Sequence, residues 1–312
     1  MTTRETPELA GRTQPHSQPH SQPHSQPHPQ PLVTVPGGRF LMGSDDPDGF
    51  AADGEGPVRA CRLDPFAIGA HAVTNEAFAG FVAATGYRTD AQRYGWSFVF
   101  KLMLPDGFPA TRAVAAAPWW RQVEGADWAH PYGPQSGLDG LERHPVVHVS
   151  WNDANSYCSW AGLRLPTEAE WERAARGGLT QRRYPWGDEL APGGRTMCNI
   201  FEGRFPDENT RADGYLATCP VDAFPPNGYG LYNMAGNVWE WTQDWFSPAP
   251  HRTAPRRNPR GPETGPGKVI RGGSYLCHDS YCNRYRVAAR TMNTVDASTG
   301  NLGFRVAGPA PP

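Results

Sequence analysis

The chain has 312 residues, a formal net charge of −2, 35 glycines and 33 prolines. Glycine and proline make up about a fifth of it, against roughly 12% in an average protein, so long helices cannot dominate the fold. The chain has no apolar run of about 18 residues, which excludes a membrane-spanning helix. Its balanced charge argues against nucleic acid or an anionic membrane as a partner. The first residues carry no apolar signal segment, so we expect a cytoplasmic protein with reduced cysteines.

Residues 1–31 form a distinct segment with four Gln-Pro-His units, which end at His16, His20, His24 and His28. Regular prolines forbid a helix and almost no apolar side chain is available for burial, so we expect a disordered tail. Weak binding of a transition metal by the evenly spaced histidines is the alternative. We expect a single folded domain over residues 32–308.

Two apolar segments open the folded part of the chain. They cover residues 32–35 and 39–43 and flank Pro36-Gly-Gly, which predicts a β-hairpin. A helix is expected over residues 74–85, because apolar side chains share one face and a glycine follows as a stop signal. The stretch over residues 90–144 is expected to be irregular.

Two further helix signals lie close together. The sequence predicts one helix over residues 150–162. Thr167 and Glu170 then form a capping box, in which a hydroxyl and a carboxylate each bond a free backbone amide of the first turn. The capping box predicts a second helix over residues 167–177. Beyond residue 184 we expect only short strands and turns.

Cys277-His-Asp-Ser-Tyr-Cys282 is the first candidate for chemistry, because two thiols five residues apart can face one another across a loop. Thiolates are soft ligands, and a pair of them suits Cu(I), which accepts a low coordination number. Neighbouring arginines, including Arg271 and Arg284, are expected to lower the thiol pKa and favour the thiolate. The motif alone leaves two alternatives open, which are a redox disulfide and a pair of ordinary loop cysteines.

Two groups of oxygen-bearing residues are candidate sites for a hard cation such as Ca²⁺. In one, Asn233 and Glu240 offer side-chain oxygens with main-chain carbonyls between them. In the other, residues 199–200 and 213–215 would come together across a longer loop. Asn, Asp and Gly are also ordinary turn residues, so the spacing alone decides neither site.

Several segments together resemble the formylglycine-generating enzyme family, also called the sulfatase-modifying factors. The resemblance runs from Leu32 to Ala307 and is carried by Val35-Pro-Gly-Gly-Arg-Phe-Leu-Met-Gly43, His148-Val-Ser-Trp-Asn-Asp153, Arg164-Leu-Pro-Thr-Glu-Ala-Glu-Trp-Glu172, Pro225-Pro-Asn-Gly-Tyr-Gly-Leu-Tyr232, Gly236-Asn-Val-Trp-Glu-Trp241, residues 271–290 and Asn301-Leu-Gly-Phe-Arg-Val306.

The resemblance implies an α+β fold with little regular secondary structure, of the sulfatase-modifying-factor, C-type-lectin-like kind. It also implies an oxidase that converts the cysteine of a Cys-x-Pro-x-Arg sequence in an unfolded sulfatase into formylglycine. Molecular oxygen would be the oxidant, Cu(I) the cofactor and Ca²⁺ a structural ion. We expect the protein to act as a monomer.

The resemblance also implies roles for individual residues. The two copper ligands would be Cys277 and Cys282, and the residues near the oxygen pocket would be Ser274 and Trp239. One calcium site would contain Asn199, Ile200, Asp213 and Tyr215, and the second Asn233, Gly236, Val238 and Glu240. The peptide groove would include Trp119, Arg290, Ser298 and Asn301.

The sequence departs from the family pattern in two places. Relatives that bind the substrate arginine through an acidic residue would place it near Trp96, where this sequence shows none. Disulfide cysteines of secretory-pathway relatives correspond to Val287 and Val306, which leaves Cys158 without the partner it would need. A reduced cytoplasmic protein fits the second departure.

Three rival functions make different demands on the sequence. A catalytically silent lectin-like paralogue that binds peptide or calcium would lack the reactive cysteine pair, whereas both cysteines are present. An iron-dependent sulfoxide synthase would need a His-x-x-x-His-x-Glu helix in another domain. His24 and His28 have that spacing, but Gln30 replaces the carboxylate and prolines forbid the helix. A purely structural calcium protein would leave peptide thiols unchanged.

Overall fold

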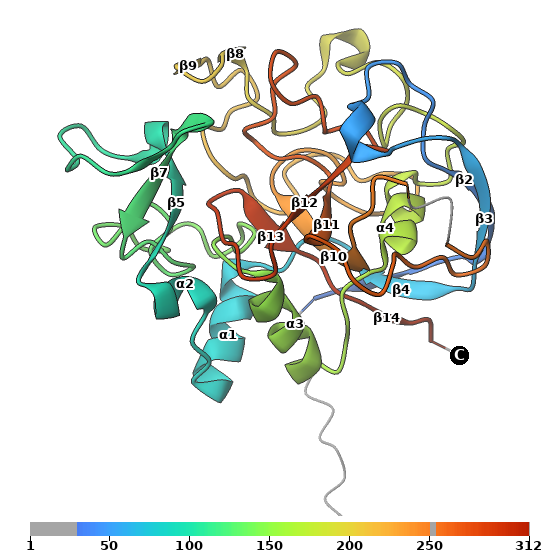
Figure 1. Ribbon diagram of the computed structural model, residues 1–312, viewed down its shortest axis with the longest axis horizontal. Coiled ribbons are helices and arrows are strands. Elements are labelled where there is room, and N and C mark those ends of the chain that lie inside the picture. Colours follow the sequence, from blue (N-terminus) through green and yellow to red (C-terminus); the bar gives the residue numbers. More distant parts are fainter. Residues whose placement is uncertain (1–29, 250–253, 312) are drawn as a thin grey trace, which may run out of the picture.

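The computed structural model describes residues 30–249 and 254–311. At the centre of the described chain lies a four-stranded sheet in the order β12-β11-β10-β13 (Figure 1). Strand β10 runs antiparallel to β11 and parallel to β13. The strands are β10 (Trp239–Trp245), β11 (Lys268–Arg271), β12 (Arg290–Asn293) and β13 (Leu302–Phe304). The predicted disordered tail, apart from residues 30 and 31, lies outside the described residues.

Four smaller sheets accompany the central one within the described ranges. In Figure 1 the sheet of β5 and β7 lies on one side of the molecule and the pair β2 and β3 on the other. The sheets are β1 (Leu32–Val35) and β14 (Ala307–Pro309) on either side of β4 (Phe66–Gly69), β2 (Gly38–Met42) with β3 (Arg59–Leu63), β5 (Trp96–Phe100) with β7 (Ala117–Glu124) and β6 (Ala113–Val114), and β8 (Gly203–Arg204) with β9 (Glu208–Asn209).

The three predicted helices are confirmed. Each begins after a residue whose hydroxyl accepts the amide three positions on, namely Thr74, Ser150 and Thr167. The helices are α1 (Asn75–Thr85), α3 (Trp151–Trp160) and α4 (Glu168–Ala175), with a short α2 (Asp90–Tyr94) and the 3₁₀ turns η1 (Ala51–Asp53), η2 (Lys101–Met103) and η3 (Pro192–Gly194). The low helix content and mixed sheets confirm the predicted α+β class.

The predicted hairpin over residues 32–35 and 39–43 is wrong. Strand β1 pairs with β4 and β2 pairs with β3, so the two segments belong to different sheets. Arg173 of α4 donates hydrogen bonds to the carbonyls of Pro36 and Gly37 at 2.6 and 2.8 Å. These contacts with a distant helix hold the Pro-Gly-Gly segment as a link between two sheets, which a local turn signal cannot reveal.

The stretch over residues 90–144 is more regular than expected. It contains α2 and the antiparallel pair of β5 and β7, in which Phe100 lies opposite Trp120. Helix α2 has only five residues, too few to show helical periodicity. Most of β7 is half-buried, so it lacks the alternation of buried and exposed side chains that marks a strand.

Buried ion pairs connect the helices to the central sheet. The guanidinium of Arg271 donates to Glu168 at 2.9 Å and to Glu172 at 2.8 Å, and all three side chains are buried. The guanidinium of Arg305 donates to both carboxylate oxygens of Glu240, at 2.6 and 2.7 Å. A buried ion pair stabilises a protein little more than two apolar side chains at the same positions would. Removing one partner, however, leaves an uncompensated buried charge. They fix how β10, β11 and α4 sit together.

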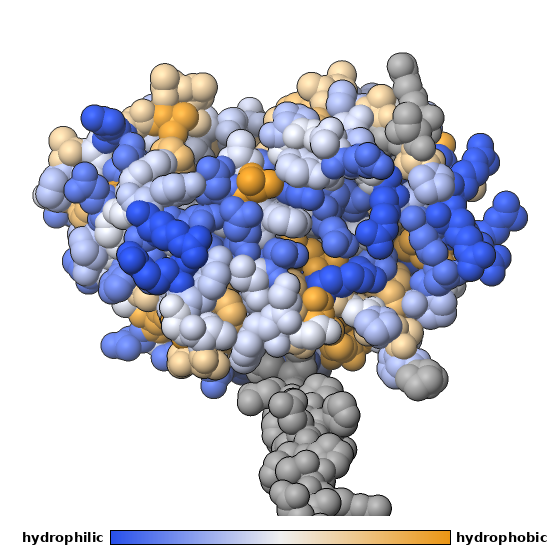
Figure 2. All heavy atoms as spheres, turned by 60° about the horizontal axis from the view of Figure 1, so that its bottom comes forward, coloured by the Kyte–Doolittle hydropathy of each residue, from blue (hydrophilic) through white to orange (hydrophobic). Residues whose placement is uncertain are grey.

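The exposed surface is mostly polar. The face shown in Figure 2 is dominated by hydrophilic residues, and hydrophobic residues form small separate groups. Within residues 30–249 and 254–311, no helix has the length and apolar character needed to cross a membrane.

His148 is a fully buried histidine in the left-handed backbone region, with φ of 57°. Its Nε2 lies 2.8 Å from the carbonyl oxygen of Pro131, and its Nδ1 lies 2.8 Å from the hydroxyl oxygen of Ser97. A carbonyl only accepts, so Nε2 carries the proton of the neutral ring. Burial lowers the pKa of His148 from 6.5 to about 4.

We expect stability to depend on pH through His148. The unfolded chain binds this proton near its ordinary pKa, whereas the folded chain resists it, so acid favours unfolding as the pH falls from about 6.5 to about 4. Between pH 7 and 4.5 the histidine should remove about 2–3 kcal/mol of the free energy of unfolding. Asp153 changes the pH dependence of stability in the opposite direction, because burial raises its pKa to about 6 and the folded chain therefore binds this proton more readily than the unfolded chain does. The measurement is therefore urea unfolding of wild type and His148→Gln at both pH values. An equal pH dependence in the two proteins would contradict the assignment.

Candidate active site

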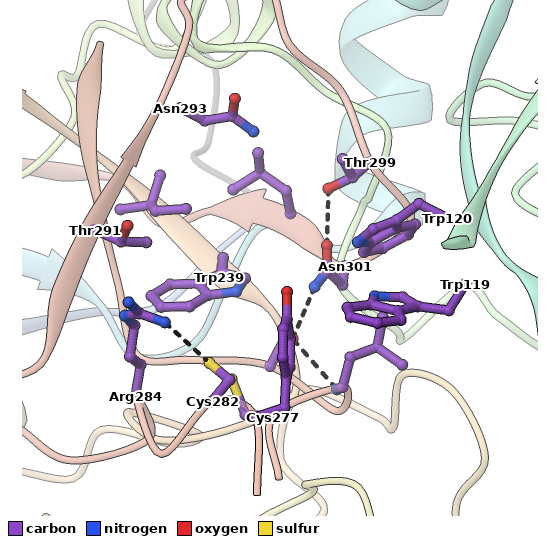
Figure 3. Close-up of a pocket in the computed structure, with 15 residues that line it drawn as sticks. Trp119, Trp120, Trp239, Cys277, Cys282, Arg284, Thr291, Asn293, Thr299 and Asn301 are labelled. Atoms are coloured by element: carbon purple, nitrogen blue, oxygen red, sulfur yellow. Dashed lines mark hydrogen bonds between the residues drawn. The ribbon is translucent and has the colours of Figure 1, made fainter. Parts of the chain in front are cut away.

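A cavity of about 240 Å³ opens beside the central sheet (Figure 3). Its lining side chains come from β7, β10, β11 and β12 and from the segments around residues 274–284 and 299–302. The sequence-predicted residues among them are Trp119, Trp239, Ser274, Cys277, Cys282 and Asn301. Strands and loops far apart in the chain therefore bring most of the expected site together.

The two cysteines of the 277–282 motif face one another inside this cavity. Their sulfurs are 2.9 Å apart, both thiols are free, and both residues are buried. Two backbone turns fold the loop back on itself, since the amide of Cys277 donates to the carbonyl of Ser274 and that of Cys282 to the carbonyl of His278. These two turns bring the two thiols close together.

The two thiols differ in their electrostatics. The hydrogen bond from Cys277 is the main cause that lowers the pKa of Cys282 to about 7, and Arg284 contributes to the same shift. Burial raises the pKa of Cys277. The Arg284 guanidinium is itself held by Asp53 at 2.5 Å, with its carbon 3.8 Å from the centre of the Phe50 ring. Arg284 thus helps to lower the pKa of Cys282, as expected of a flanking arginine, whereas at Cys277 burial outweighs the effect of the same guanidinium.

A hydrogen-bonded row of polar side chains forms another part of the cavity wall (Figure 3). Thr299 donates to the side-chain oxygen of Asn301 at 2.8 Å, and the Asn301 amide donates to the hydroxyl of Ser274 at 2.8 Å. The backbone of Asn301 is fixed as well, because its carbonyl accepts the amide of Trp239. Neutral hydrogen-bonding groups therefore lie close to the thiol pair.

Aromatic side chains form the remaining wall. Tyr281, which is 45% exposed, meets Trp119 edge to face at 4.7 Å and stacks on Phe205 at 4.9 Å between ring centres. Trp239 lines the cavity from β10. These rings give the cavity an apolar side.

Residues 17–310 match the family described as the sulfatase-modifying factor enzyme 1-like domain. This chain belongs to that family. It is 62% identical to a formylglycine-generating enzyme of Thermomonospora curvata over 280 residues, which cover 88% of this chain and 92% of the relative. It is 54% identical to the mouse formylglycine-generating enzyme, over 88% of this chain and 74% of the relative.

The family also contains proteins that are named inactive. A bovine relative called inactive Cα-formylglycine-generating enzyme 2 is 46% identical, over 88% of this chain and 87% of its own. Among solved structures, PvdO from Pseudomonas aeruginosa matches with a TM-score of 0.65 and 25% identity, over 92% of this chain and 97% of that one. The likeness to PvdO supports the fold, and the choice between active and inactive relatives rests on the site residues.

Two predicted peptide-groove residues lie outside the lining of the cavity. The guanidinium of Arg290 is buried and donates to both carboxylate oxygens of Glu168, at 2.5 and 2.9 Å. The buried hydroxyl of Ser298 lies 2.8 Å from that of Ser97. Both residues thus support neighbouring segments in this structure.

Several residues that line the cavity were not predicted from the sequence. They include the cation Arg284, named there only as a flanking charge, and the side chains Trp120, Tyr281, Thr291, Asn293 and Thr299. The residues from β12 and from the 299–302 turn carry ordinary polar side chains with no motif of their own. Thr291, Asn293 and Thr299 lie between the segments that carry the family resemblance, so the resemblance did not mark them either.

A carboxylate does lie beside Trp96, although the sequence around it shows none. The exposed Glu124 of β7 stands directly opposite Trp96 in the register of the antiparallel pair. Pairing between strands that are distant in sequence creates this neighbour.

The first predicted calcium site contains two buried oxygens that lack partners. They are Oδ1 of Asn199 and Oδ2 of Asp213. The Asn199 amide nitrogen donates to the carbonyl of Ala217 at 2.9 Å, and a carbonyl only accepts, so the amide oxygen must face the other way. Burial raises the pKa of Asp213 to about 6. Unpartnered buried oxygens of this kind suit a hard cation.

In the second predicted calcium site, only one of the two expected side-chain oxygen donors lacks a partner. Oδ1 of Asn233 is buried without a partner, and its amide nitrogen donates to the carbonyl of Val221 at 3.0 Å. Both oxygens of Glu240, by contrast, accept from Arg305, and one also accepts from Trp171 at 2.7 Å. The structure therefore places the Glu240 carboxylate in an ion pair, with Gly236 and Val238 able to offer only main-chain carbonyls.

Proposed function

We propose that this chain converts the cysteine of a Cys-x-Pro-x-Arg sequence in unfolded sulfatases into Cα-formylglycine, with molecular oxygen as oxidant and Cu(I) as cofactor. The observation that carries the proposal is the free thiol pair of Cys277 and Cys282 inside an aromatic cavity. A catalytically silent paralogue would have no need of this pair. The identity to formylglycine-generating enzymes over most of the chain supports the same conclusion.

The donor set at the cavity fits Cu(I). Two soft sulfurs converge, and the described residues offer no group of three or more His, Cys, Asp or Glu side chains that would favour a harder or higher-coordinate metal there. The cavity beside the thiols leaves space for the substrate sulfur as a further ligand. When bound, Cu(I) supplies the one-electron chemistry toward oxygen that protein side chains lack.

The protein's own residues position the reactants. Arg284 balances the negative charge of the Cys282 thiolate, and the proton of Cys277 must leave when both sulfurs bind a metal. The rings of Trp119 and Trp239 exclude water, and Ser274 presents a hydroxyl held by Asn301. The site thus supplies orientation and a low-polarity environment.

The proposed reaction balances with a thiol reductant. The substrate side chain changes from CH₂SH to CHO, so one C–H bond and the C–S bond break and sulfur leaves as H₂S. One oxygen atom of O₂ enters the aldehyde and the other leaves as water. Two of the four electrons that reduce O₂ come from the substrate carbon, and two come from oxidation of two reductant thiols to a disulfide.

The test uses the purified full chain with Cu(I), oxygen, a thiol reductant and a peptide carrying Cys-x-Pro-x-Arg. We expect an aldehyde on the peptide that reacts with a hydrazine probe. A peptide with serine in place of the cysteine is the matched control and should remain unlabelled. Copper binding without any aldehyde would overturn the proposal in favour of a silent paralogue that binds peptide or calcium.

We also propose that Asn199 and Asp213 hold a structural Ca²⁺ with the main-chain oxygens of Ile200 and Tyr215. A second Ca²⁺ would involve Asn233 and main-chain oxygens of the following turn. The support is the set of buried, unpartnered side-chain oxygens at Asn199, Asp213 and Asn233.

Removal of calcium should lower the melting temperature. At a calcium concentration about 100 times the Kd, binding adds about 2.7 kcal/mol to stability, which corresponds to a fall in Tm of about 5–10 °C after chelation. Asp213→Asn should lose most of this calcium dependence, whereas the exposed Asp139→Asn should keep it. Differential scanning calorimetry with and without chelator measures the effect. An unchanged Tm in the chelated wild type would contradict the site.

A cytoplasmic, reducing location and a monomeric state complete the proposal. All six cysteines are free and buried, and Cys158 packs in the same core cluster as Val306. The thiols are thus compatible with a reducing compartment. The small, separate hydrophobic groups on the face in Figure 2 support the monomer.

A further inference from the structure

Asn237 lies between the first cation site and the thiol pair. It is 2% exposed and adopts a left-handed backbone with φ of 61°. Its amide donates to the carbonyl of Asn199 at 2.8 Å, and its carbonyl accepts from the amide of Tyr275 at 2.9 Å. A single residue therefore joins a cation-site residue to the turn that carries Ser274 and Cys277.

The side chain of Asn237 ties in a third segment. Its Oδ1 accepts from the amide of Cys219 at 3.0 Å, and its Nδ2 donates to the carbonyl of the same residue at 3.1 Å. The segment before Cys219 holds the Asn199 side chain through the carbonyl of Ala217. The orientation of the Asn199 amide oxygen thus depends on a backbone that Asn237 holds in place.

A second connection runs directly from the cation-site loop to a thiol residue. The amide of Phe201 donates to the carbonyl of Cys277 at 3.0 Å. The cation-site loop also packs closely against Gly236, where a Cβ would lie 2.3 Å from the carbonyl oxygen of Asn199. A shift of residues 199–201 therefore moves the backbone of Cys277 or breaks these hydrogen bonds.

Loss of the cation would cause residues 199–201 to shift. Without a cation, Oδ1 of Asn199 and Oδ2 of Asp213 have no partner among the described residues, whereas Oδ1 of Asp213 accepts from the amide of Tyr215 at 2.9 Å. A buried polar atom without a partner costs about 1–3 kcal/mol. The surrounding loops lower that cost by moving until the oxygens reach water or a donor. The same movement strains the contacts of Asn237 and Phe201 with the turn that carries Ser274 and Cys277.

We propose that Asn237 is a positioning residue that couples the cation site at Asn199 and Asp213 to the thiol pair, so that Ca²⁺ bound there raises the affinity of Cys277 and Cys282 for Cu(I). The inference rests on the proposed function for the identity of the two metals. Coupling between two sites is reciprocal, so Cu(I) must raise the affinity for Ca²⁺ by the same factor.

The test measures metal binding and not turnover. The full chain is titrated with Cu(I) against a chromophoric Cu(I) chelator, at saturating Ca²⁺ and again after Ca²⁺ is removed. We expect Cu(I) binding to weaken about tenfold without Ca²⁺, within the usual range of coupling between sites. Calcium titrations with and without Cu(I) should show the same factor.

Three variants separate coupling from general destabilisation. Asn237→Gly keeps the backbone conformation and the main-chain hydrogen bonds accessible but removes the side-chain bonds to Cys219, and should make the dependence of Cu(I) affinity on Ca²⁺ clearly smaller than in wild type. Asp213→Asn should show the weak Cu(I) affinity of calcium-free wild type at every Ca²⁺ concentration. Asn227→Ala is the matched control, because its half-buried side-chain amide also bonds backbone groups, at Ala174 and Tyr229, and it should keep the coupling.

The outcomes are distinguishable. Cu(I) binding that is equally tight with and without Ca²⁺ overturns the coupling and leaves the proposed function standing. A wild-type chain that binds no Cu(I) overturns both. Coupling of the full wild-type size in Asn237→Gly shows that the main-chain contacts alone carry it and overturns the role of the Asn237 side chain.

Discussion

Replacing either thiol of the pair, as Cys277→Ser or Cys282→Ser, should abolish tight Cu(I) binding and reduce turnover by more than about a thousandfold. Serine is nearly the same size, but its hard oxygen is a poor ligand for the soft Cu(I) ion. The two sulfurs are 2.9 Å apart and would act as one ligand pair in the proposed copper site, so either substitution should remove almost the whole effect. Cu(I) titration against a competing chelator, together with the hydrazine assay, measures both losses.

The control for this prediction is a buried thiol outside the cavity. Cys61 of β3 is 2% exposed and does not line the cavity, so Cys61→Ala should lose some stability and retain Cu(I) binding. Melting temperatures show whether each variant is folded. A folded Cys282→Ser protein with wild-type affinity for Cu(I) would contradict the assignment.

Arg305→Met should destabilise the protein by about 3–5 kcal/mol, because it leaves the buried Glu240 carboxylate without its compensating charge. Arg305 is fully buried, and its guanidinium also donates to the carbonyls of Gly69 and Tyr232. The substitution therefore removes contacts to three segments at once. Chemical unfolding of wild type and variant measures the difference.

Two further measurements test the role of Glu240. Adding Glu240→Gln to Arg305→Met removes the orphaned charge, so the double variant should be less destabilised than the sum of the single ones. If Glu240 instead bound Ca²⁺ through its carboxylate, as the family resemblance implies, the cost of Arg305→Met would depend on Ca²⁺. A cost below about 1 kcal/mol in either condition would show that the ion pair is not the main partner of Glu240.

Local signals predicted the parts of the fold that depend on neighbouring residues. The capping residues Thr74, Ser150 and Thr167 act over three positions, and the three helices that follow them were predicted correctly. The short α2, capped by Thr89, was missed. Strand pairing is not local, and the wrong hairpin at Pro36-Gly-Gly shows the consequence. Its turn residues are typical of a hairpin, but contacts with Arg173 and with other strands decide the pairing.

The candidate site shows the same division. Cys277 and Cys282 lie five positions apart, so their convergence could be predicted from the sequence. Thr299 and Asn293 line the cavity only because their segments fold beside the turn that carries Cys277. Nothing in their local sequence indicates this position. The ion pair of Glu240 with Arg305, which are 65 positions apart, was equally hidden.

The chemistry assigned to the thiol pair is tested most directly by tandem mass spectrometry of a Cys-x-Pro-x-Arg peptide after incubation with the copper-loaded chain, oxygen and a thiol reductant. We expect formylglycine at the cysteine position with wild-type protein, and an unchanged cysteine with a folded Cys277→Ser variant. An unchanged cysteine with copper-loaded wild type, or formylglycine formed equally by Cys277→Ser, would contradict it.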